Sequence, residues 1–241
     1  MTTGVLQVVL ISAIPVGAAF LGATIAALRP PGHVVRSSIQ HFAAGVIFSV
    51  VAVELLPEVR RGHDPFEVGW TFAAGVALML AIDAVVKRFD HAGGHGDARG
   101  PSPGQLVPIG VDLLLDGVLI GIAMTAGLKQ GVLLTIALTL ELFSLGLAMA
   151  VQFGTAKFAV RVLAPTAIAC LMIVGAALGV TLLADASVHT LAGLLSFGCA
   201  ALLFLVTEEL LIEAHESADT AVTTTMFFVG FLIFLLLGML E

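Results

Sequence analysis

The sequence predicts an all-α protein, a polytopic membrane helix bundle with about eight transmembrane helices. Of its 241 residues, 59% are hydrophobic and only 11% are charged, whereas a soluble domain carries about 25% charged residues. The mean hydropathy is +1.11. Apolar runs long enough to cross a bilayer alternate with short breaks rich in proline, glycine and charge.

The predicted spans follow these apolar runs along a single transmembrane domain, residues 1–241. In order they are residues 5–28, 39–56, 67–86, 106–128, 131–153, 163–184, 189–212 and 221–240. The first run lacks a basic leader and is too long for a signal peptide, so we expect it to be a span. The segment 87–104 is rich in glycine and is expected to be a flexible loop.

The distribution of Lys and Arg predicts the orientation. With the N-terminus outside, the loops facing the cytoplasm would carry Arg29, Arg36, Lys87, Arg88, Arg99, Lys157 and Arg161, and the outer loops Arg60, Arg61 and Lys129. Since positive residues concentrate on the cytoplasmic side, both termini are expected outside and 87–104 in the cytoplasm. We expect an integral protein of a plasma membrane, the inner membrane of a bacterium.

Two acids lie inside the fourth predicted span. Asp112 and Asp116 are four residues apart, so a helix places them on one face, one turn apart. Placing two aspartates at the centre of a membrane costs about 5–7 kcal/mol unless water or a cation offsets it. We interpret this face as a cation site. The alternative is a pair of protonated acids that join helices by hydrogen bonds.

A third acid, Glu141, lies at mid-depth in the fifth span. The pattern Asp112, three residues, Asp116-Gly117 is echoed by Glu141, three residues, Leu145-Gly146 in a span that runs the other way. Inverted repeats of this kind place substrate sites near the midplane. Three carboxylates form a hard oxygen set, suited to Mg²⁺, Ca²⁺ or Mn²⁺. The alternative for Glu141 is a hydrogen bond that packs two helices.

Further acids lie near span ends. Glu54 in the second span could gather cations at an outer mouth, and Glu208 and Glu209 in the seventh could form a cation exit at the inner end. For each, the alternative is a solvated helix end. Asp83 is expected to form a local ion pair with Lys87, four residues on, and His41 is expected at the membrane interface.

Other functions find little support in the sequence. With Lys and Arg totalling 10 and a net charge of −7, a nucleic-acid partner is not expected. No H-E-x-x-H motif indicates a zinc hydrolase, and no G-x-G-D motif an aspartyl protease, so we expect no enzyme. Cys170 and Cys199 lie in apolar runs and are expected in the core. The Gly175-x-x-x-Gly179 pattern is expected to serve intrachain helix packing.

Two stretches resemble the ZIP (Zrt/Irt-like) family of divalent metal transporters. The seventh span, ALLFLVTEELLIEAHE, is similar to that family's A-L-L-Y-V-V-x-E-E-L-I-P-E-A-H segment, and the second, FAAGVIFSVVAVELLPE, to its G-F-A-A-G-V-M-L…H-L-L-P-E segment. The resemblance implies eight spans in a 3+2+3 inverted-repeat arrangement, termini outside and a possible homodimer. It also implies a divalent cation as substrate: zinc, cadmium, manganese or iron.

The departures from the family pattern fall at the transport site. The fourth span has Asp112 in place of the family's His but keeps Asp116-Gly117, and the fifth has Glu141 in place of a His and Leu145 in place of a Glu. Glu54 likewise replaces a His. The loss of imidazole should weaken the preference for zinc. Without metal, three mid-membrane carboxylates would not all be charged, so metal binding would release protons.

The leading hypothesis is therefore a metal transporter that moves a divalent cation toward the cytoplasm through Asp112, Asp116 and Glu141. The alternative is a ZIP-like membrane protein that has lost transition-metal transport and carries protons or another solute, or only binds. The lipid bilayer and metal ions are the expected partners.

Overall fold

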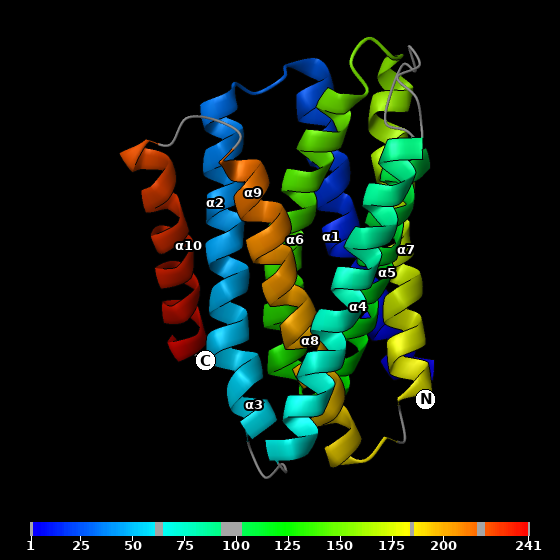
Figure 1. The fold of residues 1–241 in the computed structure, drawn as a ribbon, viewed down its shortest axis with the longest axis vertical. Coiled ribbons are helices and arrows are strands. Elements are labelled where there is room, and N and C mark those ends of the chain that lie inside the picture. The colour runs from blue at the N-terminus through cyan, green and yellow to red at the C-terminus, as the bar shows by residue number, and fades with distance from the viewer. Residues whose placement is uncertain (1, 61–64, 93–102, 184–185, 216–219, 241) are drawn as a thin grey trace.

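The computed structural model describes residues 2–60, 65–92, 103–183, 186–215 and 220–240, and these ranges are all-helical apart from short connections. Eight helical rods in them are long and apolar enough to cross a membrane (Figure 1). The predicted fold class, an all-α polytopic bundle, is thereby confirmed.

The helices follow the predicted spans in order. They are α1 (Thr2–Leu28), α2 (His33–Val50), η1 (Val51–Leu55), α3 (Leu56–Arg60), α4 (Pro65–Ala92), α5 (Pro103–Ala126), α6 (Leu128–Gln152), α7 (Phe158–Leu182), α8 (Val188–Phe204), η2 (Leu205–Leu210), α9 (Leu211–Ala214) and α10 (Ala221–Leu240). Segments η1 and η2 are π-helical turns within two continuous rods, α2–η1–α3 and α8–η2–α9. π-Helical turns inside α-helices are rare and occur often at functional sites.

Several helices extend beyond the predicted spans. Helix α2 begins at His33 rather than at residue 39, and α7 at Phe158 rather than at residue 163. Hydropathy marks the stretch that suits hydrocarbon, while backbone hydrogen bonding continues into polar turns outside it. For the same reason the predicted loop 87–104 is too long, since α4 continues to Ala92 and α5 begins at Pro103. Proline suits the first helical position because its missing N–H needs no partner there. Residues 93–102, where flexibility was predicted, lie outside the described residues.

The two ends of the bundle carry different connections. Figure 1 shows the N- and C-termini at one end, which we call the lower end, and the links from α1 to α2 and from α6 to α7 at the opposite, upper end. Successive rods run in opposite directions, so each crosses the full height of the bundle.

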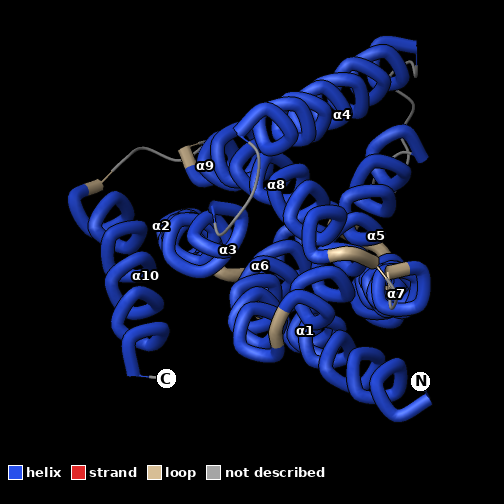
Figure 2. The backbone as a smooth tube through the Cα atoms, turned by 90° about the horizontal axis from the view of Figure 1, so that it is seen from below, coloured by secondary structure: helices blue, strands red, loops and turns tan. Residues whose placement is uncertain are grey.

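Helices α1, α5, α6 and α7 form a central group, with two helix pairs beside it (Figure 2). Helix α10 packs along α2, and α4 packs along α8. These contacts obey an internal symmetry. The contact of α1 with α6 corresponds to that of α7 with α5, and the contact of α2 with α10 to that of α8 with α4. Spans one to three thus match spans six to eight, and span four matches span five. Because matched spans run in opposite directions, the fold is the predicted 3+2+3 inverted repeat.

Close backbone contacts at two glycines show the same symmetry within the central group. A Cβ on Gly22 of α1 would lie 2.2 Å from the Phe143 carbonyl oxygen of α6, and one on Gly175 of α7 would lie 2.1 Å from the Leu114 carbonyl oxygen of α5. Without side chains at these glycines the helix backbones meet directly. The prediction that Gly175 serves intrachain packing is confirmed.

Glycines also allow close backbone contacts within the outer helix pairs. A Cβ on Gly230 of α10 would lie 2.3 Å from the carbonyl oxygen of Phe42, and one on Gly75 of α4 would lie 2.6 Å from that of Phe197. Both the two glycines and the two phenylalanines are 155 positions apart in the sequence. The outer helix pairs of the two repeats are therefore related by a fixed spacing of 155 residues in the sequence.

The same spacing relates a motif that the sequence analysis overlooked. Glu-Leu-Leu-x-Glu occurs at residues 54–58 and again at 209–213. Its first glutamate is the next-to-last residue of η1 in one copy and of η2 in the other. Each half of the molecule thus presents an equivalent glutamate from a π-helical turn.

Two side chains differ from their predicted surroundings. His41 was predicted at the interface, but it is only 2% exposed, because α2 begins early and α9 packs against it. Cys170 was predicted in the core, but it is exposed on α7, whereas Cys199 is buried as expected, and both are free thiols. An apolar run does not reveal which of its residues face lipid.

Candidate metal centre

The structure brings the three mid-membrane acids together. Asp112 and Asp116 lie one turn apart on α5, and Glu141 lies on α6, which packs against α5. One carboxylate oxygen from each lies within 4.8 Å of the others. Asp112 and Glu141 are equivalent under the inverted repeat, because they are 29 residues apart, as are Leu114 and Phe143, which make the matched glycine contacts of the two central helices. We call these three residues the acidic triad.

Two members of the triad are buried, Asp112 is half-buried, and the carboxylates are incompletely hydrogen-bonded. Asp116 is 3% exposed and Glu141 4%. Within the described part of the chain, Asp116 Oδ2 and Glu141 Oε2 are buried and have no hydrogen-bond partner. A buried polar atom without a partner costs about 1–3 kcal/mol, and more when it is charged. Such atoms therefore indicate that protons, water or an ion complete this site.

The chemistry of the triad suits a hard cation. Among the described residues, no Lys, Arg or His forms an ion pair with any of the three carboxylates. A divalent cation would offset most of their combined charge and would find the oxygen ligands that Mn²⁺, Mg²⁺ and Ca²⁺ prefer. The missing imidazole and thiolate ligands make this site unlike the usual zinc centre.

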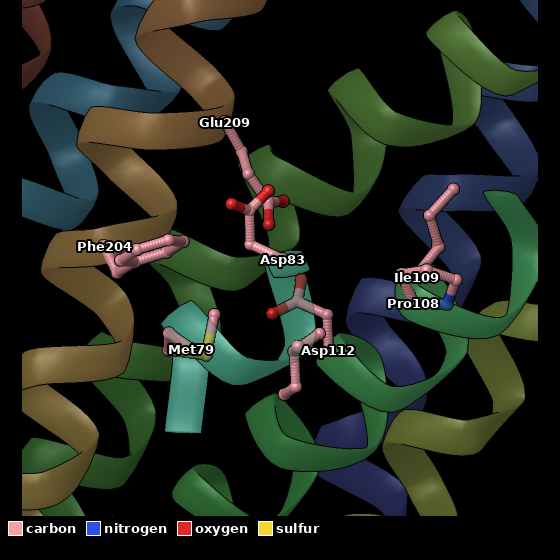
Figure 3. Close-up of a pocket in the computed structure, with 8 residues that line it drawn as sticks. Met79, Asp83, Pro108, Ile109, Asp112, Phe204 and Glu209 are labelled. Carbon is pink, nitrogen blue, oxygen red and sulfur yellow. The ribbon is translucent and has the colours of Figure 1, made fainter. Parts of the chain in front are cut away.

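A cavity of about 260 Å³ reaches the triad from the upper half of the bundle. Asp112 lines it together with Asp83 of α4 and Glu209 of η2, and Figure 3 shows these three carboxylates turned toward the same space. The remaining lining is mostly apolar and comprises Met79, Ile82, Pro108, Ile109 and Phe204. Asp112 therefore connects the buried pair, Asp116 and Glu141, to the cavity.

Of the two glutamates predicted as an exit, only Glu209 is among the residues that line this cavity. Glu209 interacts electrostatically with all three triad carboxylates. Glu208 is exposed and lies near Lys87. The predicted Lys87–Asp83 ion pair is confirmed, with Nζ 2.6 Å from Oδ2. This hydrogen bond raises the pKa of Lys87 above its ordinary value, and the charges of Asp83 and Glu208 raise it further.

Glu54 lies elsewhere, in the lower half of the bundle. It is 9% exposed, and its Oε1 lies 3.6 Å from Nζ of Lys129, the second residue of α6. The same ammonium group donates a hydrogen bond of 2.9 Å to the Gly238 carbonyl oxygen of α10. Glu54 thus lies beside the ends of two other helices, apart from the triad, and it is paired with a cation of the protein itself.

Sequence reasoning missed two features of this arrangement. It treated Asp83 only as the partner of Lys87, although the side chain also lines the cavity. It also assigned Lys129 to a loop, although Lys129 pairs with Glu54 across 75 positions of sequence. The repeated Glu-Leu-Leu-x-Glu motif was the signal that could have singled out Glu54 and Glu209 as equivalents.

No protein-family model matches this chain, and no curated protein matches it. The fold and the site therefore define the class by themselves. The protein is a membrane-spanning helix bundle with a buried acidic triad that could bind a metal ion.

Proposed function

We propose that the protein transports a divalent metal cation across the membrane through the acidic triad, in the manner of the ZIP family that its second and seventh spans resemble. One observation carries the proposal. Two carboxylate oxygens without partners, on Asp116 and Glu141, lie beside Asp112, which lines a cavity together with Glu209. Intramembrane acids that face a cavity typically mark an ion pathway.

The cavity gives the proposed transporter a direction in this conformation. It communicates with the upper half of the bundle, where Glu209 lies, while Glu54 at the lower end is paired with Lys129. With the termini outside, as the Lys and Arg distribution predicts, the upper end faces the cytoplasm. The metal would leave through the space beside Glu209 and Glu208. Glu54 would receive it from outside when the lower end opens.

The ligand set bears on which metal is carried. Three carboxylates favour Mn²⁺ or Fe²⁺ over Zn²⁺ and Cd²⁺ relative to a site with histidines, since softer or borderline ions gain most from nitrogen and sulfur ligands. We therefore expect manganese to be transported better than zinc, and magnesium to be held back by its slow dehydration.

A second candidate function is the transport of protons or another solute without a transition metal. Three neighbouring carboxylic acids can hold and pass protons. The departures from the family pattern, Asp112 and Glu141 in place of histidines, favour this candidate. It predicts that the triad binds no divalent cation.

The test is Mn²⁺ uptake by proteoliposomes that contain the full-length protein, compared with the variant Asp116→Asn. The substitution keeps the size of the side chain and removes its charge. Glu67→Gln, an acid of the first turn of α4, serves as the matched control. We expect flux in the wild type and in the control, and none in Asp116→Asn.

Equal flux in the wild type and Asp116→Asn would overturn the role of the triad. Absence of Mn²⁺, Fe²⁺ and Zn²⁺ flux in the wild type, together with proton flux that Asp116→Asn removes, would replace metal transport by the second candidate. Measurement of both ions in the same vesicles separates these outcomes.

A further inference from the structure

Apart from the Ser49 hydroxyl, the buried polar atoms without a partner in the described part of the chain fall into two groups. One is the acidic triad. The other is the upper part of α2, where both amide atoms of Gln40 and Nε2 of His41 are buried and unpartnered. Gln40 is 1% exposed. The feature that marks the triad as a binding site thus occurs again, with an imidazole nitrogen and an amide group in place of carboxylate oxygens.

The surroundings of His41 fix its tautomer. Its Nδ1 lies 2.9 Å from the Ser37 carbonyl oxygen, one turn earlier. Since a carbonyl oxygen can only accept a hydrogen bond, Nδ1 carries the proton and donates it. In the neutral ring Nε2 therefore keeps its lone pair. Histidines that bind metals commonly have this arrangement, in which the second nitrogen donates to a backbone carbonyl.

A second imidazole lies against the first. His215 follows α9, and the centroid of its ring is 5.0 Å from that of His41, with the ring planes tilted by 57°. Its Nδ1 contacts the Leu211 carbonyl oxygen, again one turn earlier. By the same reasoning Nδ1 carries the proton, and Nε2 is the nitrogen with ligand character. Both rings therefore have the same tautomer.

Hydrogen bonding holds the two rings in place. The Ser37 hydroxyl donates a bond of 2.8 Å to the Ala214 carbonyl oxygen, which joins α2 directly to the residue before His215. Ser37 Oγ also lies 3.3 Å from His41 Nδ1. One serine thus fixes the spacing of the two helices and the orientation of one ring, which is the support that a metal-ligating histidine requires.

We propose that His41 and His215 form a second metal site, separate from the triad, for a transition-metal dication such as Co²⁺ or Zn²⁺. The ligands are Nε2 of each imidazole, and water completes the coordination shell. Imidazole suits these ions better than Mg²⁺, Ca²⁺ or Mn²⁺. The chain would therefore hold two sites of different chemistry, a carboxylate site on α5 and α6 and an imidazole site between α2 and α9.

The test is titration of the full-length protein with Co²⁺ in detergent, followed by visible absorption. The background variant Asp116→Asn disables the triad, so that the second site is observed alone. We expect one Co²⁺ per chain in this background, with absorption bands of nitrogen ligation. We expect His41→Phe, which keeps an aromatic ring in the buried position, to reduce Co²⁺ affinity at least about 100-fold, since even changes outside a ligand set cost 10–100-fold.

Two further variants make the result decisive. His215→Ala changes an exposed residue at the end of a helix, so it tests the site even if His41→Phe does not fold. His33→Ala removes an exposed imidazole from the same helix, α2, and should leave the titration unchanged. Co²⁺ binding that is equal in the background, His41→Phe and His215→Ala proteins would overturn the proposal.

The outcome is independent of the proposed transport. Failure of transport would appear as unchanged Mn²⁺ flux in Asp116→Asn, whereas failure of the second site would appear as unchanged Co²⁺ spectra in the two histidine variants.

Discussion

Glu54 and Glu209 hold the same place in the two halves of the inverted repeat, yet their surroundings are opposite. Each begins a Glu-Leu-Leu-x-Glu motif, and each lies in a π-helical turn. Glu54 is buried and paired with the Lys129 ammonium group, whereas Glu209 is exposed and lines the cavity that reaches Asp112. In a single conformation, one copy of the motif contributes to an ion pair, at what we call the closed end, and the other lines a cavity, at what we call the open end.

The difference arises from what the neighbouring helices contribute. Lys129 lies near the start of α6 and pairs with Glu54, whereas position 100, which is 29 residues earlier in the sequence, is a glycine outside the described residues. The first half of the repeat therefore has a cation to pair with its glutamate, and the second half has no lysine at the matching position. The comparison shows that symmetry-related helices can differ in their ion pairs when a single residue departs from the repeat.

The largest expected effect concerns the centre that both ends share. Replacing Glu141 by Gln removes one ligand of the triad without changing the size of the side chain. We expect Mn²⁺ affinity to fall at least about 100-fold, because changes outside a ligand set already cost 10–100-fold. Titration of the detergent-solubilised protein, followed by the electron paramagnetic resonance of free Mn²⁺, measures this. Unchanged affinity would mean that the open and closed ends do not lead to a common metal site.

The next effect tests the repeat itself through its outer glycines. Gly75→Ala and Gly230→Ala each place a methyl group under 3 Å from a carbonyl oxygen of the neighbouring helix. Overpacking of this kind costs about 1–3 kcal/mol. We expect both variants to lower the midpoint of thermal unfolding by similar amounts. Gly17→Ala, with no atom within 4 Å of the added methyl, is the control and should not lower it. A loss in only one of the two variants would show that the halves are not packed equivalently.

A smaller effect is expected at the closed end. Lys129→Met removes the partner of a buried carboxylate, and breaking a fully buried pair costs about 3–5 kcal/mol. Because Lys129 is partly exposed, we expect about 1–2 kcal/mol, a value between those of buried and surface pairs. Thermal unfolding measures the loss, and the double variant Glu54→Gln with Lys129→Met should recover most of it. No recovery would mean that Lys129 acts through Gly238 and not through Glu54.

The smallest effect on stability is expected at the open end. Glu209→Gln changes an exposed side chain, and such substitutions usually alter stability by less than about 0.5 kcal/mol. Its effect should instead appear in the rate at which bound Mn²⁺ leaves, which stopped-flow mixing with a chelator measures. Destabilisation as large as that of Lys129→Met would remove the contrast between the two ends.

The sequence predicted most of the fold and the centre of the site. Long apolar runs suffice to place eight spans, and acids inside them are so costly that Asp112, Asp116 and Glu141 stood out at once. Helix ends were predicted less well because polar residues such as Arg36 and Ser37 continue a helix that hydropathy no longer marks.

The remaining features depend on contacts between distant residues. Glu54 pairs with Lys129 because their helices lie in contact although the two residues are 75 positions apart in the sequence. His41 is buried because α9 and the residue that follows it pack against the imidazole ring. Proline, which otherwise signals a break in a helix, does not mark both π-helical turns, because Pro57 follows the first turn but no proline lies in or after the second. The spacing of 155 residues was present in the sequence, but only the glycine contacts showed that it relates two halves of one structure.

The opposite orientation of the two outer repeats determines how the membrane potential acts on a transported ion. The second repeat begins after five spans, an odd number, so its copy of the motif lies toward the opposite end of the bundle from the first copy. The membrane potential therefore falls between Glu54 and Glu209. A divalent cation that passes from one to the other carries two charges through this field, worth about 4.6 kcal/mol for each 100 mV. If the protein transports metal as proposed and its termini lie outside, a negative potential in the cytoplasm would draw the ion inward even against a concentration gradient.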